Sequence, residues 1–160
     1  MKQKAIAKIF GDWEQSYQRL RKLLLAYLDQ DLGTRYFYHT IPGSVPGTTL
    51  LCYVFWAFTL CIDGFRYCKP VISIDGTHLY GKYRRVLLIA MATNANNKVF
   101  PLVFAIVNKD SGPSWGWFLK CLRVSIGHVI SNEGICIISN RHAGIKSAIV
   151  VWPRGDDERL

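Results

Sequence analysis

The segment from residue 71 to residue 107 most constrains how this chain can fold, because it holds three short apolar runs separated by turns. The runs are Val71–Ile74, Val86–Ala90 and Val99–Val107. Gly81-Lys82 marks the bend between the first two, and Asn94-Ala-Asn-Asn97 is a strong turn signal before the third. Three strands this closely spaced favour an antiparallel meander.

The segments around this meander carry helical patterns and one further strand. Apolar and aromatic residues recur at three- and four-residue steps from Asp12 to Leu28, and the same spacing returns in residues 111–126, where Ser114 is a candidate N-cap. Ile135–Ile138 predicts a fourth, fully apolar strand of the kind found inside a sheet. Residues 141–151 predict a last helix. The expected order is one or two helices followed by β-β-β-α-β-α, which is a mixed α/β layer fold.

Two segments separate the first helix from the meander. Thr40–Thr49 contains two Pro-Gly pairs and almost no large apolar side chains, so it predicts a linker or an exposed turn. Leu50–Ile62 is the longest apolar stretch and predicts a buried helix or strand, since it is shorter than the roughly 18 apolar residues of a membrane span. We therefore expect a helical region with a linker at residues 1–49 and an α/β domain at residues 50–160.

The charge balance of the chain favours a polyanionic partner. Lys and Arg total 20 against 11 Asp and Glu, which gives a formal net charge of +9. Nucleic acid is favoured over a membrane, because neutralising phosphates releases counterions. A basic protein without such a partner remains the alternative on charge alone. Half of the residues are apolar and 13% are aromatic, which excludes a disordered chain.

The cysteines and the N-terminus bear on the compartment. The five cysteines form no Cys-x-x-Cys pair and cannot all pair with one another, so neither a zinc knuckle nor a secreted disulfide framework is indicated. This usage favours a reducing compartment. The basic N-terminus has no apolar core followed by small residues, so we expect no signal peptide.

Two of the predicted strands end in a small polar residue followed by a turn-like segment. The first reads Ile74-Asp75-Gly76-Thr77-His78 and the second Ile138-Ser139-Asn140-Arg141-His142. In an α/β fold, the ends of neighbouring strands can bring such residues onto one metal ion or substrate. This requires the first and fourth predicted strands to be adjacent. The alternative is structural, with Asp75 capping a turn and Asn140 capping the following helix.

Several linked segments resemble the transposase domain of plant Mutator-like elements, the MuDR family. The resemblance covers nearly the whole chain, from about Trp13 to Gly155, and its motifs occur in the family's order. The segments that carry it are Cys61–Tyr83, Leu88–Thr93, Asn96–Leu102, Ser114–Leu119 and Gly134–Ser139.

This resemblance implies an RNase H-like core in which three acidic residues, the DDE set, hold two Mg²⁺ or Mn²⁺ ions for DNA cleavage and strand transfer. Asp75 matches the first catalytic and metal-binding aspartate. The family reads Ser-Asp-Arg-His at the second, where this chain has Asn140. The third acid is expected after the last residue of this sequence, so we expect a domain that is incomplete at its C-terminus.

The substitution at position 140 predicts a loss of catalysis. Mg²⁺ prefers anionic oxygen ligands, and clustered carboxylates are what make two adjacent dications tolerable. Asn140 offers a carbonyl dipole without charge, so we expect this copy to be catalytically inactive. Two alternatives are a non-catalytic DNA- or protein-binding module derived from a transposase and a different RNase H-like nuclease. The resemblance also implies transposon-end DNA and a transposase oligomer as partners, and a nuclear location.

Five basic residues near the two strand ends are candidates for contacts with DNA phosphates. Lys82, Arg84 and Arg85 lie in the bend after the first strand of the meander, and solvated turn residues are the alternative. Arg141 and His142 fall at a predicted helix N-terminus, where backbone N–H groups already favour an anion.

Other polar and aromatic residues have structural interpretations. His78 could order a metal-bound water, although the favoured interpretation is a histidine packed with hydrogen bonds. Helical spacing places Trp115 and Phe118 in the core and leaves Trp117 as the one exposed ring of that helix for base stacking. Asn94 occupies a turn that tolerates either Asn or Asp, so we assign it no catalytic role.

Overall fold

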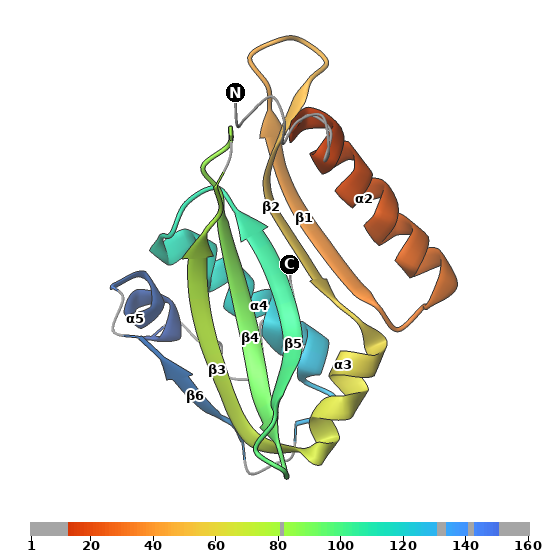
Figure 1. Ribbon diagram of the computed structural model, residues 1–160. Helices are drawn as coiled ribbons and strands as arrows, with labels where there is room; N and C mark the ends of the chain where they lie inside the picture. Colours follow the sequence, from red (N-terminus) through yellow and green to blue (C-terminus); the bar gives the residue numbers. More distant parts are fainter. Residues whose placement is uncertain (1–12, 81, 131–133, 141–142, 151–160) are drawn as a thin grey trace, which may run out of the picture.

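The computed structural model describes residues 13–80, 82–130, 134–140 and 143–150, and these form a mixed α/β fold (Figure 1). A six-stranded sheet in the order β1-β2-β5-β4-β3-β6 has helices on both sides. The predicted fold class is confirmed at this level. In chain order the elements are α2 (Trp13–Gln30), β1 (Arg35–Pro42), β2 (Thr49–Ala57), α3 (Thr59–Gly64), the short 3-10 helix η1 (Phe65–Tyr67), β3 (Cys68–His78), β4 (Val86–Asn94), β5 (Val99–Val107), α4 (Gly112–Ile126), β6 (Cys136–Ser139) and α5 (Ala143–Val150).

The predicted antiparallel meander is confirmed as β3, β4 and β5. The turn between β4 and β5 is held by Asn94, whose side-chain Oδ1 accepts the backbone N–H groups of Asn96 at 3.0 Å and Lys98 at 2.9 Å. Asn97 has a φ of 58°, the left-handed conformation that Asn tolerates better than most residues. An aspartate at position 94 could accept the same two hydrogen bonds, so the structure gives Asn94 a role in the turn.

The strand β6 pairs in parallel with β3, which makes the first and fourth predicted strands neighbours. Ile74 of β3 lies opposite Ser139 of β6, after a crossover through α4. Within the described chain, however, β6 is an outer strand of the sheet, and the side chains of Cys136 and Ile138 are exposed. Among the described residues β6 pairs with β3 alone, so the expectation of a strand inside the sheet is wrong for this part of the chain.

The strand β1, which the sequence patterns did not predict, forms an antiparallel hairpin with β2. The predicted exposed turn is confirmed for residues 43–48, where the Gly43 N–H donates to the Thr48 carbonyl at 2.8 Å. Leu50–Ile62 is neither one helix nor one strand, since it holds most of β2 followed by α3. Residue 49, where we expected the helical region and linker to end, is the first residue of β2. The strand β1 escaped prediction because its aromatic run, Tyr36-Phe37-Tyr38, is only three residues long and is followed by polar residues and a proline.

Helices cover the two faces of the sheet unequally. The α4 face is the side packed against α4 and α5. There Trp115, Phe118 and Leu122 are almost completely buried, which confirms the core placement of the first two. The α2 face is the opposite side, where α2 lies along β1 and β2 and leaves β3, β4 and β5 uncovered by any described helix (Figure 1). The α4 face therefore contains most of the hydrophobic core.

The N-cap of α4 differs from the one predicted. Ser111, rather than Ser114, is its N-cap, and the Ser111 side chain accepts a hydrogen bond from the Ser114 N–H. Ser114 is completely buried in the first turn. Gly127 follows the last helical residue, as predicted.

Candidate functional site

The two polar positions singled out in the sequence, Asp75 and Asn140, meet in the structure, although the expectation that Asp75 ends its strand is wrong, because β3 continues to His78 in pairing with β4. Because β3 and β6 are parallel and adjacent, Asp75 and Asn140 come together although they are 65 residues apart. The Asn140 Nδ2 donates a hydrogen bond of 3.4 Å to Oδ1 of Asp75, and that oxygen also accepts the Gly76 N–H at 2.9 Å. Both side chains are exposed to solvent. The geometry is that of a carboxylate held by amide donors.

The residue after Asp75 is a glycine for a packing reason. A β-carbon at Gly76 would lie 3.2 Å from the Trp115 ring and 3.1 Å from a methyl group of Leu88. A side chain at position 76 would thus lie on the α4 face. Because side chains alternate along a strand, Asp75 lies on the α2 face. Trp115 is held in turn by its indole N–H, which donates to Oδ1 of Asp110 at 2.7 Å. The Asp75-Gly76 pair joins the candidate site directly to the core.

The donor set at this position does not suit a pair of divalent cations. Among the residues that the structure describes, no three His, Cys, Asp or Glu side chains come close enough to hold a metal ion. Asp75 contributes one carboxylate, and its neighbour Asn140 adds no negative charge. Two adjacent dications need several anionic ligands to offset their repulsion. The described residues therefore do not fit the two-metal site that the sequence resemblance implies.

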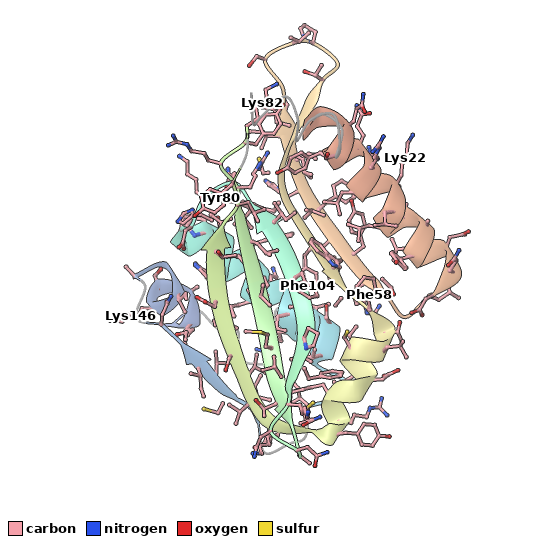
Figure 2. All side chains as sticks on the ribbon, in the orientation of Figure 1. Lys22, Phe58, Tyr80, Lys82, Phe104 and Lys146 are labelled. Carbon is pink, nitrogen blue, oxygen red and sulfur yellow. The ribbon has the colours of Figure 1, made fainter. Side chains whose placement is uncertain are left out.

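A cleft of about 730 Å³ opens where β3 ends, β4 begins and β5 ends. His78, Tyr80 and Arg84 line it from the β3–β4 connection, and Asn108, Lys109 and Asp110 line it from the segment after β5. Tyr80 is 96% exposed. Figure 2 shows Tyr80 beyond the end of β3, on the side away from α3. This cleft brings polar groups from two connections to one end of the sheet.

Arg85 has a different position from its neighbour Arg84. Its guanidinium donates to the backbone carbonyls of Leu51 at 2.7 Å and Cys52 at 3.1 Å, both on β2. The intervening strand β5 ends at Val107, opposite Tyr53, so these carbonyls lie beyond its reach. Arg85 therefore supplies hydrogen bonds where the sheet has no strand between β2 and β4.

Aromatic contacts extend this arrangement to α2. The Tyr17 ring on α2 lies 5.8 Å from the Arg85 guanidinium carbon and packs edge-on against Tyr83 at 5.7 Å. Burial raises the pKa of the Tyr17 hydroxyl, and the nearby positive charge of Arg85 partly opposes that rise. These contacts tie the β3–β4 connection to both α2 and β2.

The other predicted site residues have diverse placements. Lys82 is exposed, and its ammonium group lies 5.3 Å from the centroid of the Tyr83 ring. His78 is exposed on the cleft, so the favoured expectation of a packed histidine is wrong. Trp117 is half-buried against Tyr53 at 5.2 Å, so the expectation of an exposed ring is also wrong. Arg141 and His142 lie outside the described residues.

Sequence reasoning missed the contribution of the third strand end. Asn108, Lys109 and Asp110 directly follow the apolar run of β5, as Asp75 follows that of β3. The rule that polar residues after an apolar strand mark a site would have found them. Tyr80 gave a weaker signal, because one aromatic residue in a turn is common.

The fold and these contacts define a mixed α/β domain with an exposed carboxylate on β3 and a polar cleft at the end of that strand. Residues 71–157, more than half of the chain, match the family model of the MULE transposase domain. The chain therefore belongs to the Mutator-like transposase family. No curated protein and no solved structure matches it. Within the described residues, no helix is both long enough and apolar enough to span a membrane.

Proposed function

We propose that this chain is a DDE-type transposase domain with an RNase H-like core, and that it contacts DNA without cleaving it. The observation that carries the proposal is the meeting of Asp75 and Asn140 on the adjacent parallel strands β3 and β6. Membership in the Mutator-like family supplies DNA cleavage and strand transfer as the reaction from which the site derives.

The sheet topology supports the RNase H-like part of this proposal. The strands β3, β4 and β5 form an antiparallel meander, and after α4 the chain returns to pair β6 in parallel with β3. This reproduces the β-β-β-α-β-α order that the sequence patterns predict. It also brings together the two positions that match the first two acids of the DDE set.

The hydrogen bond between Asn140 and Asp75 explains why this copy would not cleave DNA. An aspartate at position 140 would place two carboxylates side by side, and their repulsion would be relieved by binding a divalent cation. Asn140 instead donates an N–H to the Asp75 carboxylate. The pair therefore carries one negative charge in place of two, and less is gained when a metal ion binds.

The net charge supports retained contact with DNA. Of the basic candidates, Arg84 lines the cleft and Lys82 is exposed, whereas the guanidinium of Arg85 is engaged with β2. We therefore propose Lys82 and Arg84 as phosphate contacts and assign Arg85 a structural role. Binding of this kind weakens as salt rises, because each neutralised phosphate releases counterions.

A metal-binding experiment tests the proposed site. The full chain and its Asn140→Asp variant would be titrated with Mn²⁺ and followed by calorimetry. We expect the variant to bind Mn²⁺ roughly tenfold more tightly, because it presents two carboxylates in place of one. The double variant Asp75→Ala/Asn140→Asp is the matched control and should lose this gain. Equal affinity in the wild-type and Asn140→Asp chains would contradict the assignment of position 140.

A cleavage assay tests the predicted loss of catalysis. Supercoiled plasmid and pre-nicked oligonucleotides would be incubated with the full chain in Mg²⁺ or Mn²⁺, and nicked and joined products separated by electrophoresis. We expect no product above background. Cleavage by the wild-type chain that disappears in Asp75→Ala would overturn the proposal of an inactive copy.

A further inference from the structure

The cleft at the end of β3 has the size of a site for a small part of a larger ligand. Its volume of about 730 Å³ lies within the range of about 300–1,000 Å³ that small-molecule sites occupy. His78 is three residues beyond Asp75, so the cleft begins about 10 Å along the strand from the candidate site. A chain-like ligand at Asp75 could therefore continue into it.

Tyr80 is the feature of this cleft that folding does not explain. Its side chain is 96% exposed, although a tyrosine ring gains stability when it is buried. It lines the cleft from the connection that Arg85 anchors to β2, and Figure 2 shows it beyond the end of β3. An exposed aromatic ring on an anchored connection is suited to stack against a planar ligand.

The lining of the cleft favours an anionic ligand with polar edges. Arg84 and Lys109 bring two positive charges to the cleft from two different connections, and Asp110 brings one negative charge. Oδ1 of Asp110 already accepts the Trp115 indole N–H, which offsets part of its charge. His78 and Asn108 add groups that donate and accept hydrogen bonds.

From these observations we infer that the cleft binds an unpaired nucleotide of the DNA strand, with its base stacked on Tyr80 and its phosphate between Arg84 and Lys109. The inference deepens the proposed function, because it takes DNA as the ligand. Paired bases within a double helix are stacked on one another and offer their edges alone, so a duplex has no free base face for Tyr80. An unpaired nucleotide offers both a base face and a flexible phosphate backbone.

The test compares single-stranded and duplex DNA as ligands of the full chain. A fluorescein-labelled oligo(dT) strand and a duplex of the same length would be titrated and followed by anisotropy at two salt concentrations. The variants are Tyr80→Ala, Tyr80→Phe, Arg84→Gln and Lys109→Gln. Tyr67→Ala is the matched control, because Tyr67 is also a strongly exposed tyrosine, at 81%, and lies on η1 before β3 begins.

We expect Tyr80→Ala to weaken oligo(dT) binding by roughly five- to a hundredfold and duplex binding by less than about twofold. Tyr80→Phe should keep most of the affinity, since its ring still stacks, and Tyr67→Ala should change neither ligand. Arg84→Gln and Lys109→Gln should each weaken oligo(dT) binding and lower its salt dependence by about one phosphate contact. An unchanged thermal unfolding midpoint in Tyr80→Ala would show that the fold is intact.

Two outcomes would overturn the inference, and they differ from a failure of the proposed function. If Tyr80→Ala leaves oligo(dT) binding unchanged, or weakens both ligands equally, the cleft does not stack an unpaired base. In either result the wild-type chain still binds DNA, so the proposed function stands. If the wild-type chain binds neither ligand at low salt, the DNA contact of the proposed function fails and the inference fails with it.

Discussion

The α4 face and the α2 face of the sheet are built from the same strands but differ in chemistry. On β3, Ile72 and Ile74 are buried against the α4 side, and Gly76 leaves room there for the Trp115 ring. Asp75 alternates to the α2 side and is exposed. One strand with a two-residue period thus supplies the core and the candidate site together.

Neighbouring residues of β3 therefore have different roles, since Ile74 packs in the core and Asp75 belongs to the candidate site. The α4 face gains its stability from buried apolar surface. The α2 face depends on directed contacts, such as the hydrogen bonds of Arg85 to β2 and the packing of Tyr17 on Arg85. Substitutions on the two faces should therefore lower stability by different amounts, and the following experiments test that difference.

The largest expected effect is on the α4 face. Trp115→Ala would remove a ring that is 1% exposed and that contacts Phe118 at 5.6 Å between centroids. We expect a loss of about 3–5 kcal/mol in the free energy of unfolding, measured by urea denaturation followed by circular dichroism. Val124→Ala, on the same helix and 42% exposed, is the control and should change stability by less than about 0.5 kcal/mol. A loss below about 1 kcal/mol in Trp115→Ala would place the core elsewhere.

A second experiment removes the directed contacts on the α2 side. Arg85→Ala leaves the carbonyls of Leu51 and Cys52 without their guanidinium donor. We expect a loss of about 2 kcal/mol in the free energy of unfolding, because hydrogen bonds to a charged group are stronger than neutral ones. Arg84→Ala, its exposed neighbour, should change stability by less than about 0.5 kcal/mol. Equal effects of the two variants would mean that Arg85 has no special structural role.

A third experiment tests the point where the two faces meet. Gly76→Ala would bring a methyl group to 3.1 Å from Leu88 and 3.2 Å from Trp115, so we expect a loss of about 1–2 kcal/mol in the free energy of unfolding. Gly116→Ala, in α4, meets nothing within 4 Å and should stabilise the chain by about 0.5–1 kcal/mol. Urea denaturation of both variants measures the difference. The same sign for both would contradict close packing at Gly76.

The smallest expected effect is a pH dependence at Tyr17. Burial raises the pKa of its hydroxyl above 10.0, the ordinary value, so the neutral form is favoured in the folded chain. The stability that this provides is complete below about pH 10 and is lost as the pH rises through the folded-state pKa. We expect the wild-type chain to lose stability relative to Tyr17→Phe over the alkaline range, as the pH rises through and above 10.0, the ordinary tyrosine pKa. A constant difference across this range would contradict burial of the hydroxyl.

Local patterns predicted most of the elements in the second half of the chain. The strand β5 was predicted with the bounds that the structure shows, because a long apolar run lies between two clear turns. The helix α4 was predicted apart from its N-cap. The strand β1 was not predicted, because its short aromatic run, Tyr36-Phe37-Tyr38, becomes a strand by pairing with β2, which a local pattern does not reveal.

By itself, the sequence determined which residues could carry chemistry, since Asp75 and Asn140 each follow an apolar run. Their identities also determined that this pair has one carboxylate and one amide. The tertiary structure alone decided that they meet, because that depends on the parallel pairing of β3 with β6. It also decided that Arg85 bonds to β2 while Arg84 lines the cleft. Arg84 and Arg85 are adjacent and look alike in the sequence. They differ in the folded chain because the backbone carbonyls of Leu51 and Cys52 on β2 lie within reach of Arg85.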